Sequence, residues 1–127
     1  MTKIDDPNEI QFRQVNPNWV QDDVPTRQAF IPTTKDEGKL SLDRSATTTA
    51  QQAHNDFTAL GLRSEAVFAI TPAECSEEPD SIECYESPLE NNPHHSHADF
   101  NGLTKSRRKK KSFELRRHAI ARGKLHP

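Results

Sequence analysis

Apolar residues in the middle of this chain recur at helical spacing, which predicts a helix at residues 49–60. Thr48 and Gln51 have the spacing of a capping box at its start, and Gly61 is a typical C-terminal stop. The apolar positions, separated by three, four and three residues, are Ala50, Ala53, Phe57 and Leu60. We therefore expect one amphipathic helix that packs on a sheet.

Short apolar segments elsewhere predict β-strands. Residues 66–70 are apolar without interruption, which indicates a strand buried on both faces, and we expect it at the centre of the sheet. Thr71 and Glu74 then form a second capping box, with Pro72 at the first helical position, and begin a short helical turn. Further extended segments are expected at residues 10–15, 29–31, 39–43, 82–85 and 97–100.

These elements predict an α+β fold made of a small sheet, one packed helix and a cationic C-terminal helix. Residues 1–9 are polar and without a period, so we expect a flexible N-terminus. Residues 10–104 form a single domain, in which residues 74–96 are an acidic, His-containing loop region. Residues 105–127 form a basic C-terminal helix and tail.

Composition indicates a modest core and no membrane segment. Leu, Ile, Val and Phe make up about a fifth of the 127 residues, near the boundary with disordered chains, but a net charge of −2 does not oppose collapse. The longest apolar run, residues 66–70, is far shorter than the roughly 20 residues of a membrane span. The chain opens with no apolar leader, so the expectation is a soluble, cytoplasmic protein without a membrane partner.

Charge is distributed very unevenly. Residues 105–124 carry ten bases against Glu114, a net charge of +9, so residues 1–104 carry −11. The stretch from residue 74 to residue 90 contains no base and seven carboxylates, which are Glu74, Glu77, Glu78, Asp80, Glu83, Glu86 and Glu90. The sequence thus predicts a molecule with one strongly basic and one strongly acidic region.

The basic segment is predicted to be a helix over residues 105–122, with Gly123 as its terminator. Its first turn and a half contains no apolar anchor and is expected to project into solvent, while four apolar residues hold its second half. Those four are Phe113, Leu115, Ala119 and Ile120. The candidate partner-binding residues are Arg107, Arg108, Lys109, Lys110, Lys111, Arg116 and Arg117.

The sign of this charge indicates an acidic partner. Lysine and arginine on a helix suit phosphate oxygens, but no aromatic residues interleave the run of bases to stack on nucleobases and the segment has no Asn or Gln, so nucleic-acid binding would be non-specific and salt-sensitive. An acidic protein, or the acidic stretch of the same molecule, would fit equally well. Our leading hypothesis is a small non-enzymatic accessory protein that binds a protein, or a nucleic acid non-specifically, through this helix.

The histidines at residues 94–97 offer a weaker candidate site. His95 and His97 point to the same side of an extended backbone and would be two metal ligands, completed by Cys75, Cys84 or Asp99. Their spacing matches no known zinc motif, so we expect no metal and no cofactor, and the two cysteines are read as reduced thiols.

A catalytic alternative has to combine scattered residues. His97 would act as a general base beside a fixed positive charge at Arg13, with Ser41 or Asp99 as further members of the site. A small enzyme acting on a phosphate-containing substrate, such as a toxin-like ribonuclease or an NAD-dependent transferase, fits the size of the chain.

Four short segments carry a resemblance to known proteins. They are FRQVNPNW at residues 12–19, QAFIP at 28–32, KLS at 39–41 and HADF at 97–100. With these segments the chain resembles, over most of residues 10–123, a group of short uncharacterised bacterial proteins. The resemblance implies a bacterial or phage origin and a compact α+β domain, and it implies no activity for any residue.

Overall fold

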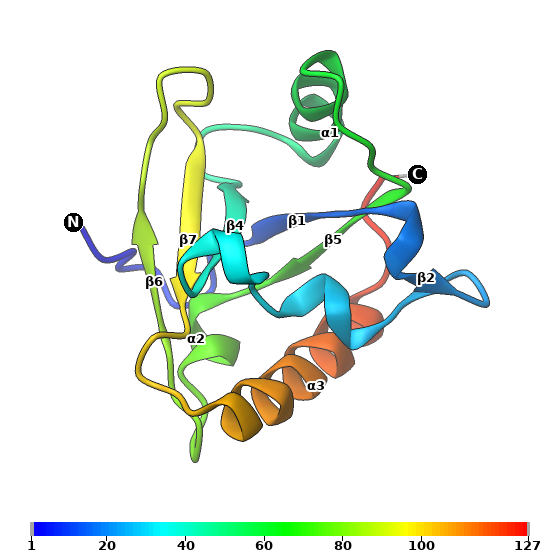
Figure 1. Ribbon diagram of the computed structural model, residues 1–127. Helices are drawn as coiled ribbons and strands as arrows, with labels where there is room; N and C mark the ends of the chain where they lie inside the picture. The colour runs from blue at the N-terminus through cyan, green and yellow to red at the C-terminus, as the bar shows by residue number, and fades with distance from the viewer. Residues whose placement is uncertain (1, 127) are drawn as a thin grey trace.

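The computed structural model describes residues 2–126, and the chain has the predicted α+β architecture (Figure 1). The strands are β1 (Gln11–Val15), β2 (Val20–Gln21), β3 (Val24–Pro25), β4 (Lys39–Arg44), β5 (Ala66–Ile70), β6 (Glu83–Glu86) and β7 (His95–Asp99). The α-helices are α1 (Ala50–Ala59), α2 (Pro72–Cys75) and α3 (Lys105–Arg122). Three 3-10 helices are η1 (Pro17–Trp19), η2 (Arg27–Phe30) and η3 (Thr34–Asp36).

Five strands form an antiparallel sheet in the order β5-β1-β4-β7-β6, and β2 pairs with β3 separately. The two longer helices lie on opposite sides of this sheet, with α1 against β1 and β5 and α3 against β5 and η2 (Figure 1). All five residues of β5 are buried, as the uninterrupted apolar run predicts. The predicted central position was wrong, because β5 is an edge strand and the helices supply its burial.

Residues outside the strands cover both edges of the sheet. The backbone N–H of Ile4 donates to the carbonyl of Cys84 at 3.0 Å along β6, and Ile4 is buried in the core. Residues 2–4 therefore pair along β6, within a segment whose polar sequence predicts a flexible N-terminus. At the other edge, the Val67 N–H donates to the His126 carbonyl at 2.9 Å.

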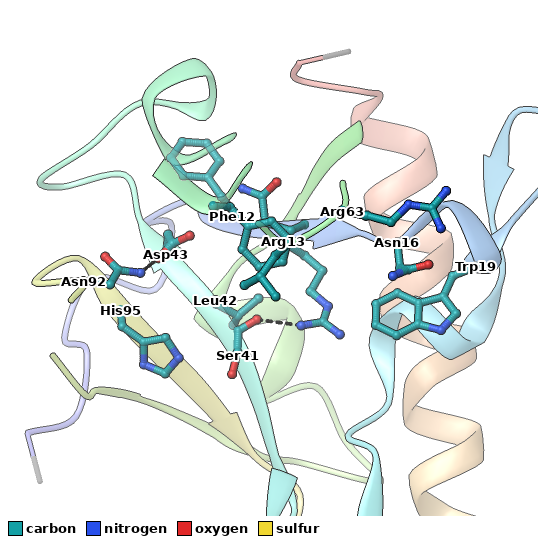
Figure 2. A pocket seen from close by; sticks show the side chains of 13 residues that line it. Phe12, Arg13, Asn16, Trp19, Ser41, Leu42, Asp43, Arg63, Asn92 and His95 are labelled. Carbon is teal, nitrogen blue, oxygen red and sulfur yellow. Dashed lines mark hydrogen bonds between the residues drawn. The ribbon is translucent and has the colours of Figure 1, made fainter. Parts of the chain in front are cut away.

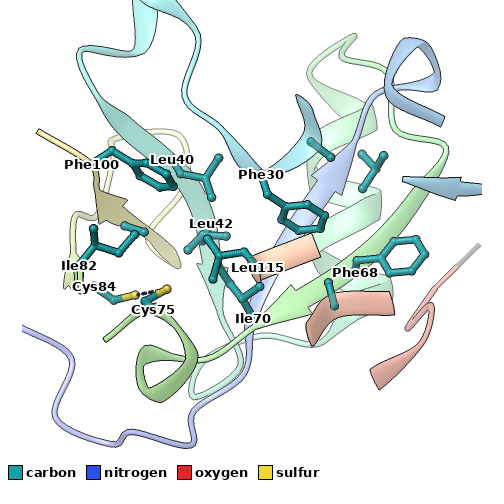
Figure 3. Close-up of a cluster of buried hydrophobic side chains, with 14 of the residues drawn as sticks. Phe30, Leu40, Leu42, Phe68, Ile70, Cys75, Ile82, Cys84, Phe100 and Leu115 are labelled. Carbon is teal, nitrogen blue, oxygen red and sulfur yellow. Dashed lines mark hydrogen bonds between the residues drawn. The ribbon is translucent and has the colours of Figure 1, made fainter. Parts of the chain in front are cut away.

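The main core lies between the sheet and α3. Large apolar side chains from strands, η2 and α3 fill it, including Phe30, Leu40, Leu42, Phe68, Ile70, Phe100 and Leu115 (Figure 3). The strand predicted at residues 29–31 is instead η2, which buries Ala29 and Phe30. Cys75 and Cys84 are free thiols in this core, with their sulfurs 3.5 Å apart. Burial and the neighbouring thiol raise the pKa of Cys75 well above its ordinary value, the hydrogen bond with Cys84 being the larger cause.

The helix caps follow the sequence closely. Helix α1 is confirmed, but its N-cap is Thr49, whose side chain accepts from the Gln52 N–H, and not Thr48. The capping box of Thr71 and Glu74 is present at the start of α2. Among the described residues, no helix is both long enough and apolar enough to cross a membrane.

Candidate functional site

Alternation along β4 and β7 places polar side chains on the sheet face away from α3. Leu40 and Leu42 enter the core, so Lys39, Ser41 and Asp43 occupy the opposite face. The register sets Ser41 beside His97, Asp43 beside His95 and Lys39 beside Asp99. Helix α1 packs on β1 and β5. On the polar half of this face Ser41 is exposed, whereas Asp43 and His97 are buried.

A small cavity of about 160 Å³ lies where β1 and β4 separate (Figure 2). These strands pair only at Gln11–Arg44 and Phe12–Asp43, whereas β1 pairs with β5 along its full length. The residues that line it include Arg13, Asn16, Trp19, Asp43, Arg63 and His95.

Arg13 is the buried cation of this cavity and is only 9 % exposed. Its Nε donates to the Ala29 carbonyl at 2.6 Å and its Nη1 donates to the Ser41 carbonyl at 3.0 Å. The guanidinium carbon lies 5.1 Å from the centre of the Trp19 ring, in a cation–π contact. Burial lowers the pKa of Arg13 to about 10, and the more distant Asp36 and Asp43 partly oppose this shift.

Asp43 and His95 line the opposite part of the cavity from Arg13 (Figure 2). The Asn92 amide donates to the Asp43 carboxylate at 2.6 Å, while burial, the larger effect, raises the pKa of Asp43. Burial also lowers the pKa of His95, which favours its neutral form near pH 7.

Ser87 joins the two strand histidines in a hydrogen-bonded cluster. Its hydroxyl lies 2.9 Å from the Nδ1 of His95 and 2.9 Å from the Nδ1 of His97. The Nδ1 of His95 also lies 2.9 Å from the Ser87 carbonyl, which only accepts, so this nitrogen carries the proton. The Ser87 hydroxyl is then free to donate to His97. Burial lowers the pKa of His97, and its buried Nε2 has no protein partner among residues 2–126.

The structure brings only some of the predicted catalytic and metal-binding residues together. His95 and His97 share Ser87 and, with Ser41, line a second cavity of about 310 Å³, whereas Arg13 lines the first cavity. Ser41 reaches Arg13 through its backbone carbonyl, and Asp99 accepts from Asn101. In the described part of the chain, no three His, Cys, Asp or Glu residues gather as metal ligands.

Ser87 is the member of this site that the sequence did not indicate. It follows β6, and its N–H donates to the His95 carbonyl, which continues the β6–β7 pairing by one step. Only the register of that hairpin places Ser87 beside the histidines. A serine before a proline otherwise indicates a turn and nothing more.

Helix α3 has the predicted bounds, but its basic first half does not simply project into solvent. Lys111 is fully buried, and its ammonium donates to the carbonyls of Glu74 and Glu77, each at 3.2 Å. Arg107 pairs with the buried Asp80 at 3.1 Å. Conversely, Phe113 does not anchor the helix, because it is 55 % exposed.

Most carboxylates of the acidic stretch are occupied within the molecule. Glu74 pairs with Arg122 at 2.7 Å, and Glu77 contacts His118. The remaining pairs are Asp80 with Arg107, Glu83 with Lys3, and Glu86 with Arg44. The acidic stretch and α3 thus form an internal charge pairing, which was one of the alternatives that the sequence left open.

The outward side of α3, which we call the outer face, retains exposed bases. Lys105, Lys109, Lys110 and Arg117 are exposed, and none forms an ion pair with a carboxylate within residues 2–126. Phe113 lies on the same helix, and the guanidinium of Arg27 sits 5.6 Å from the centre of its ring.

Two shallow hollows border the outer face. One lies beside the first turn, where Lys105 and Lys109 border an apolar floor that includes Ile31 and Leu103. The other contains Phe113 and Ile120 together with basic residues of the same helix.

No protein-family model, no curated protein and no solved structure matches the chain.

Proposed function

We propose that the protein is a small interaction protein that binds an acidic partner protein through the outer face of α3. The observation that carries the proposal is the division of charge on this helix. Arg107 and Arg122 pair with carboxylates of the same chain and Lys111 is buried, whereas Lys109 and Lys110 stay exposed without a carboxylate partner among the described residues. The internal pairs orient the helix and leave the outer face to an external acidic surface.

An acidic protein fits this face better than a nucleic acid does. Phe113 is an exposed aromatic residue between bases, and Ile120 lines the hollow beside it. Aromatic residues at the centre of an interface often contribute most to protein binding, and basic residues around them set the charge of the partner. A phosphate backbone would use the bases but would leave the apolar hollows unfilled.

The test is fluorescence anisotropy with a labelled helical peptide that carries Glu on one face and Leu on the other, beside labelled duplex DNA and single-stranded RNA. Peptide binding should weaken by about tenfold in Phe113→Ala and in Lys109→Glu/Lys110→Glu. Lys111 is left unchanged because it is buried. The matched control reverses two exposed bases outside α3, Lys35→Glu/Lys124→Glu, and should retain the affinity.

The outcomes separate the two kinds of partner. Duplex or RNA binding that falls with salt and with the Lys109/Lys110 reversal, but not in Phe113→Ala, would indicate a nucleic-acid surface and overturn the choice of a protein. No saturable binding to the peptide, or equal losses in the control variant, would reject the outer face as the contact.

The enzymatic alternative has less support. A phosphate-containing substrate handled by His97 and Arg13 needs both side chains at one reacting group, yet they line different cavities. We therefore place the interaction role first.

A further inference from the structure

We propose that the cavity beside Arg13 is a binding site for a small oxyanion, a phosphate or carboxylate group, which is held by the Arg13 guanidinium. This site uses no residue of the outer face of α3, so the two proposals are independent and a negative result for one does not affect the other.

The guanidinium of Arg13 is incompletely hydrogen-bonded within the protein. Arginine has five N–H donors, and in Arg13 only Nε and Nη1 have protein acceptors among residues 2–126. Its Nη2 has no protein acceptor in this part of the chain, and this nitrogen is not fully buried. The structure thus leaves donors of Arg13 available to a ligand in the cavity that it lines.

The positive charge of Arg13 also has no carboxylate beside it among residues 2–126. A buried cation is unfavourable unless it is paired, and no carboxylate in the described part of the chain lies within ion-pairing distance of Arg13. The hydrogen-bond and cation–π partners of Arg13 are uncharged, so they stabilise its positive charge only through the carbonyl dipoles of Ala29 and Ser41 and the ring quadrupole of Trp19. An oxyanion would supply the missing charge, and guanidinium binds such groups through two parallel hydrogen bonds.

The size and lining of the cavity suit a small anionic group. A volume of about 160 Å³ holds a few water molecules, each of which takes about 30 Å³ in the liquid, so it suits one small group and not a dinucleotide. Arg63 lines the same cavity and is exposed, which places a second positive charge near its opening. Asn16 and Trp19 complete the side nearest Arg13 (Figure 2).

The remaining titratable groups limit the ligand. Asp43 and His95 line the cavity away from Arg13, and the Asp43 carboxylate would repel an anion that filled the whole space. The oxyanion group therefore belongs at the Arg13 and Trp19 end. A larger ligand would turn its uncharged or hydrogen-bond-donating part toward Asp43.

The position of the only tryptophan makes the site testable. Trp19 contacts Arg13, so its fluorescence reports on the cavity itself. The intact protein is titrated with inorganic phosphate and, separately, with acetate, at constant ionic strength set with chloride. In parallel, two-dimensional NMR follows the Nε–H of Arg13, which is held by the Ala29 carbonyl.

Saturable quenching or enhancement of Trp19, with a dissociation constant on the order of 1 mM and a shift of the Arg13 Nε–H signal, is the expected result. Phosphate alone would identify the group as a phosphate, and acetate alone would identify a carboxylate. Arg63→Gln should weaken binding severalfold, whereas Lys35→Gln, an exposed base that does not line the cavity, should not.

Arg13→Gln should abolish the response if the variant folds. If it does not fold, the wild-type titration and the Arg63→Gln comparison decide. No saturable change at Trp19 with either anion, or a response equal to that of chloride, would overturn the site and leave Arg13 as a purely structural bridge between Ala29 and Ser41.

Discussion

Replacing Lys111 with alanine is expected to destabilise the protein strongly, although the residue lies in a run of five bases. Lys111 is fully buried, and alanine removes three methylene groups beyond Cβ, which contribute about 2.5 kcal/mol at about 0.8 kcal/mol each. Two backbone carbonyls, of Glu74 and Glu77, also lose their donor, and the Glu114 carboxylate loses its ion pair with Lys111 at 3.5 Å, while the desolvation of the ammonium is relieved. The net loss should be about 3 kcal/mol.

Two further variants separate packing from charge. Lys111→Met keeps most of the buried volume and loses only the ammonium, so it should be destabilised by about 1 kcal/mol. Lys110→Ala removes an exposed neighbour and should change the stability by less than about 0.5 kcal/mol.

Urea unfolding, followed by circular dichroism, measures these differences. With a slope of about 1.5 kcal/mol per molar, Lys111→Ala should lower the midpoint by about 2 M. Equal midpoints for Lys111→Ala and Lys110→Ala, or a lower midpoint for Lys111→Met than for Lys111→Ala, would contradict a stabilising role for the buried Lys111 side chain.

Three further predictions concern backbone conformation, pH and the thiols. Gly38→Ala should destabilise the protein by about 1–2 kcal/mol, because Gly38 has φ +76° and a Cβ would overlap the Asn101 side chain, whereas Gly102→Ala has free space and should be neutral in the same urea assay. Stability should fall from pH 7.5 to 5.5, because burial lowers the pKa of His95 and of His97, so the unfolded state takes up protons near its ordinary pKa of 6.5 while the folded state does not. A urea midpoint that stays constant over this range, or that rises as the pH falls, would contradict the assignment. Both cysteines are buried, so iodoacetamide at pH 8 should modify them slowly in the native protein and rapidly in urea, as mass spectrometry would show; equal rates would place them outside the core.

Helical spacing and capping residues correctly predicted the elements that depend on contacts between residues close together in the sequence. The helix at residues 50–59, the capping box at Thr71 and the basic helix that ends at Arg122 are all present. Each depends on contacts a few residues apart, such as a cap hydrogen bond. The error of one residue at the first cap reflects two adjacent threonines with equal local suitability.

Long-range contacts account for what the sequence did not reveal. Ile4 is an isolated apolar residue in a polar segment, and only pairing with β6 shows why it is buried. The strand at residues 66–70 is apolar throughout because helices cover both of its faces. An uninterrupted apolar pattern shows that both faces are buried, but it does not show whether the strand lies at the centre or at the edge of the sheet.

The candidate sites show the same division. The sequence identified His95 and His97 as facing one side, which the shared contact with Ser87 confirms. Ser87 itself depends on the register of a hairpin. Charge alone also does not distinguish Lys111 from Lys110, because only the helix phase relative to α2 decides which ammonium is buried.

The covered edges of the sheet restrict how this protein can assemble with other chains. Along β5, residues 125 and 126 bond both backbone groups of Val67, and Arg122 donates to the Ala69 carbonyl at 2.8 Å. Along β6, the Thr2 carbonyl accepts from Glu86, and the Ile4 N–H occupies the Cys84 carbonyl. A second sheet or an extended peptide that sought to add a strand would first have to displace these segments. Association at the two edges of this sheet without such displacement must therefore proceed through side chains, and loss of either covering segment should promote edge-to-edge aggregation.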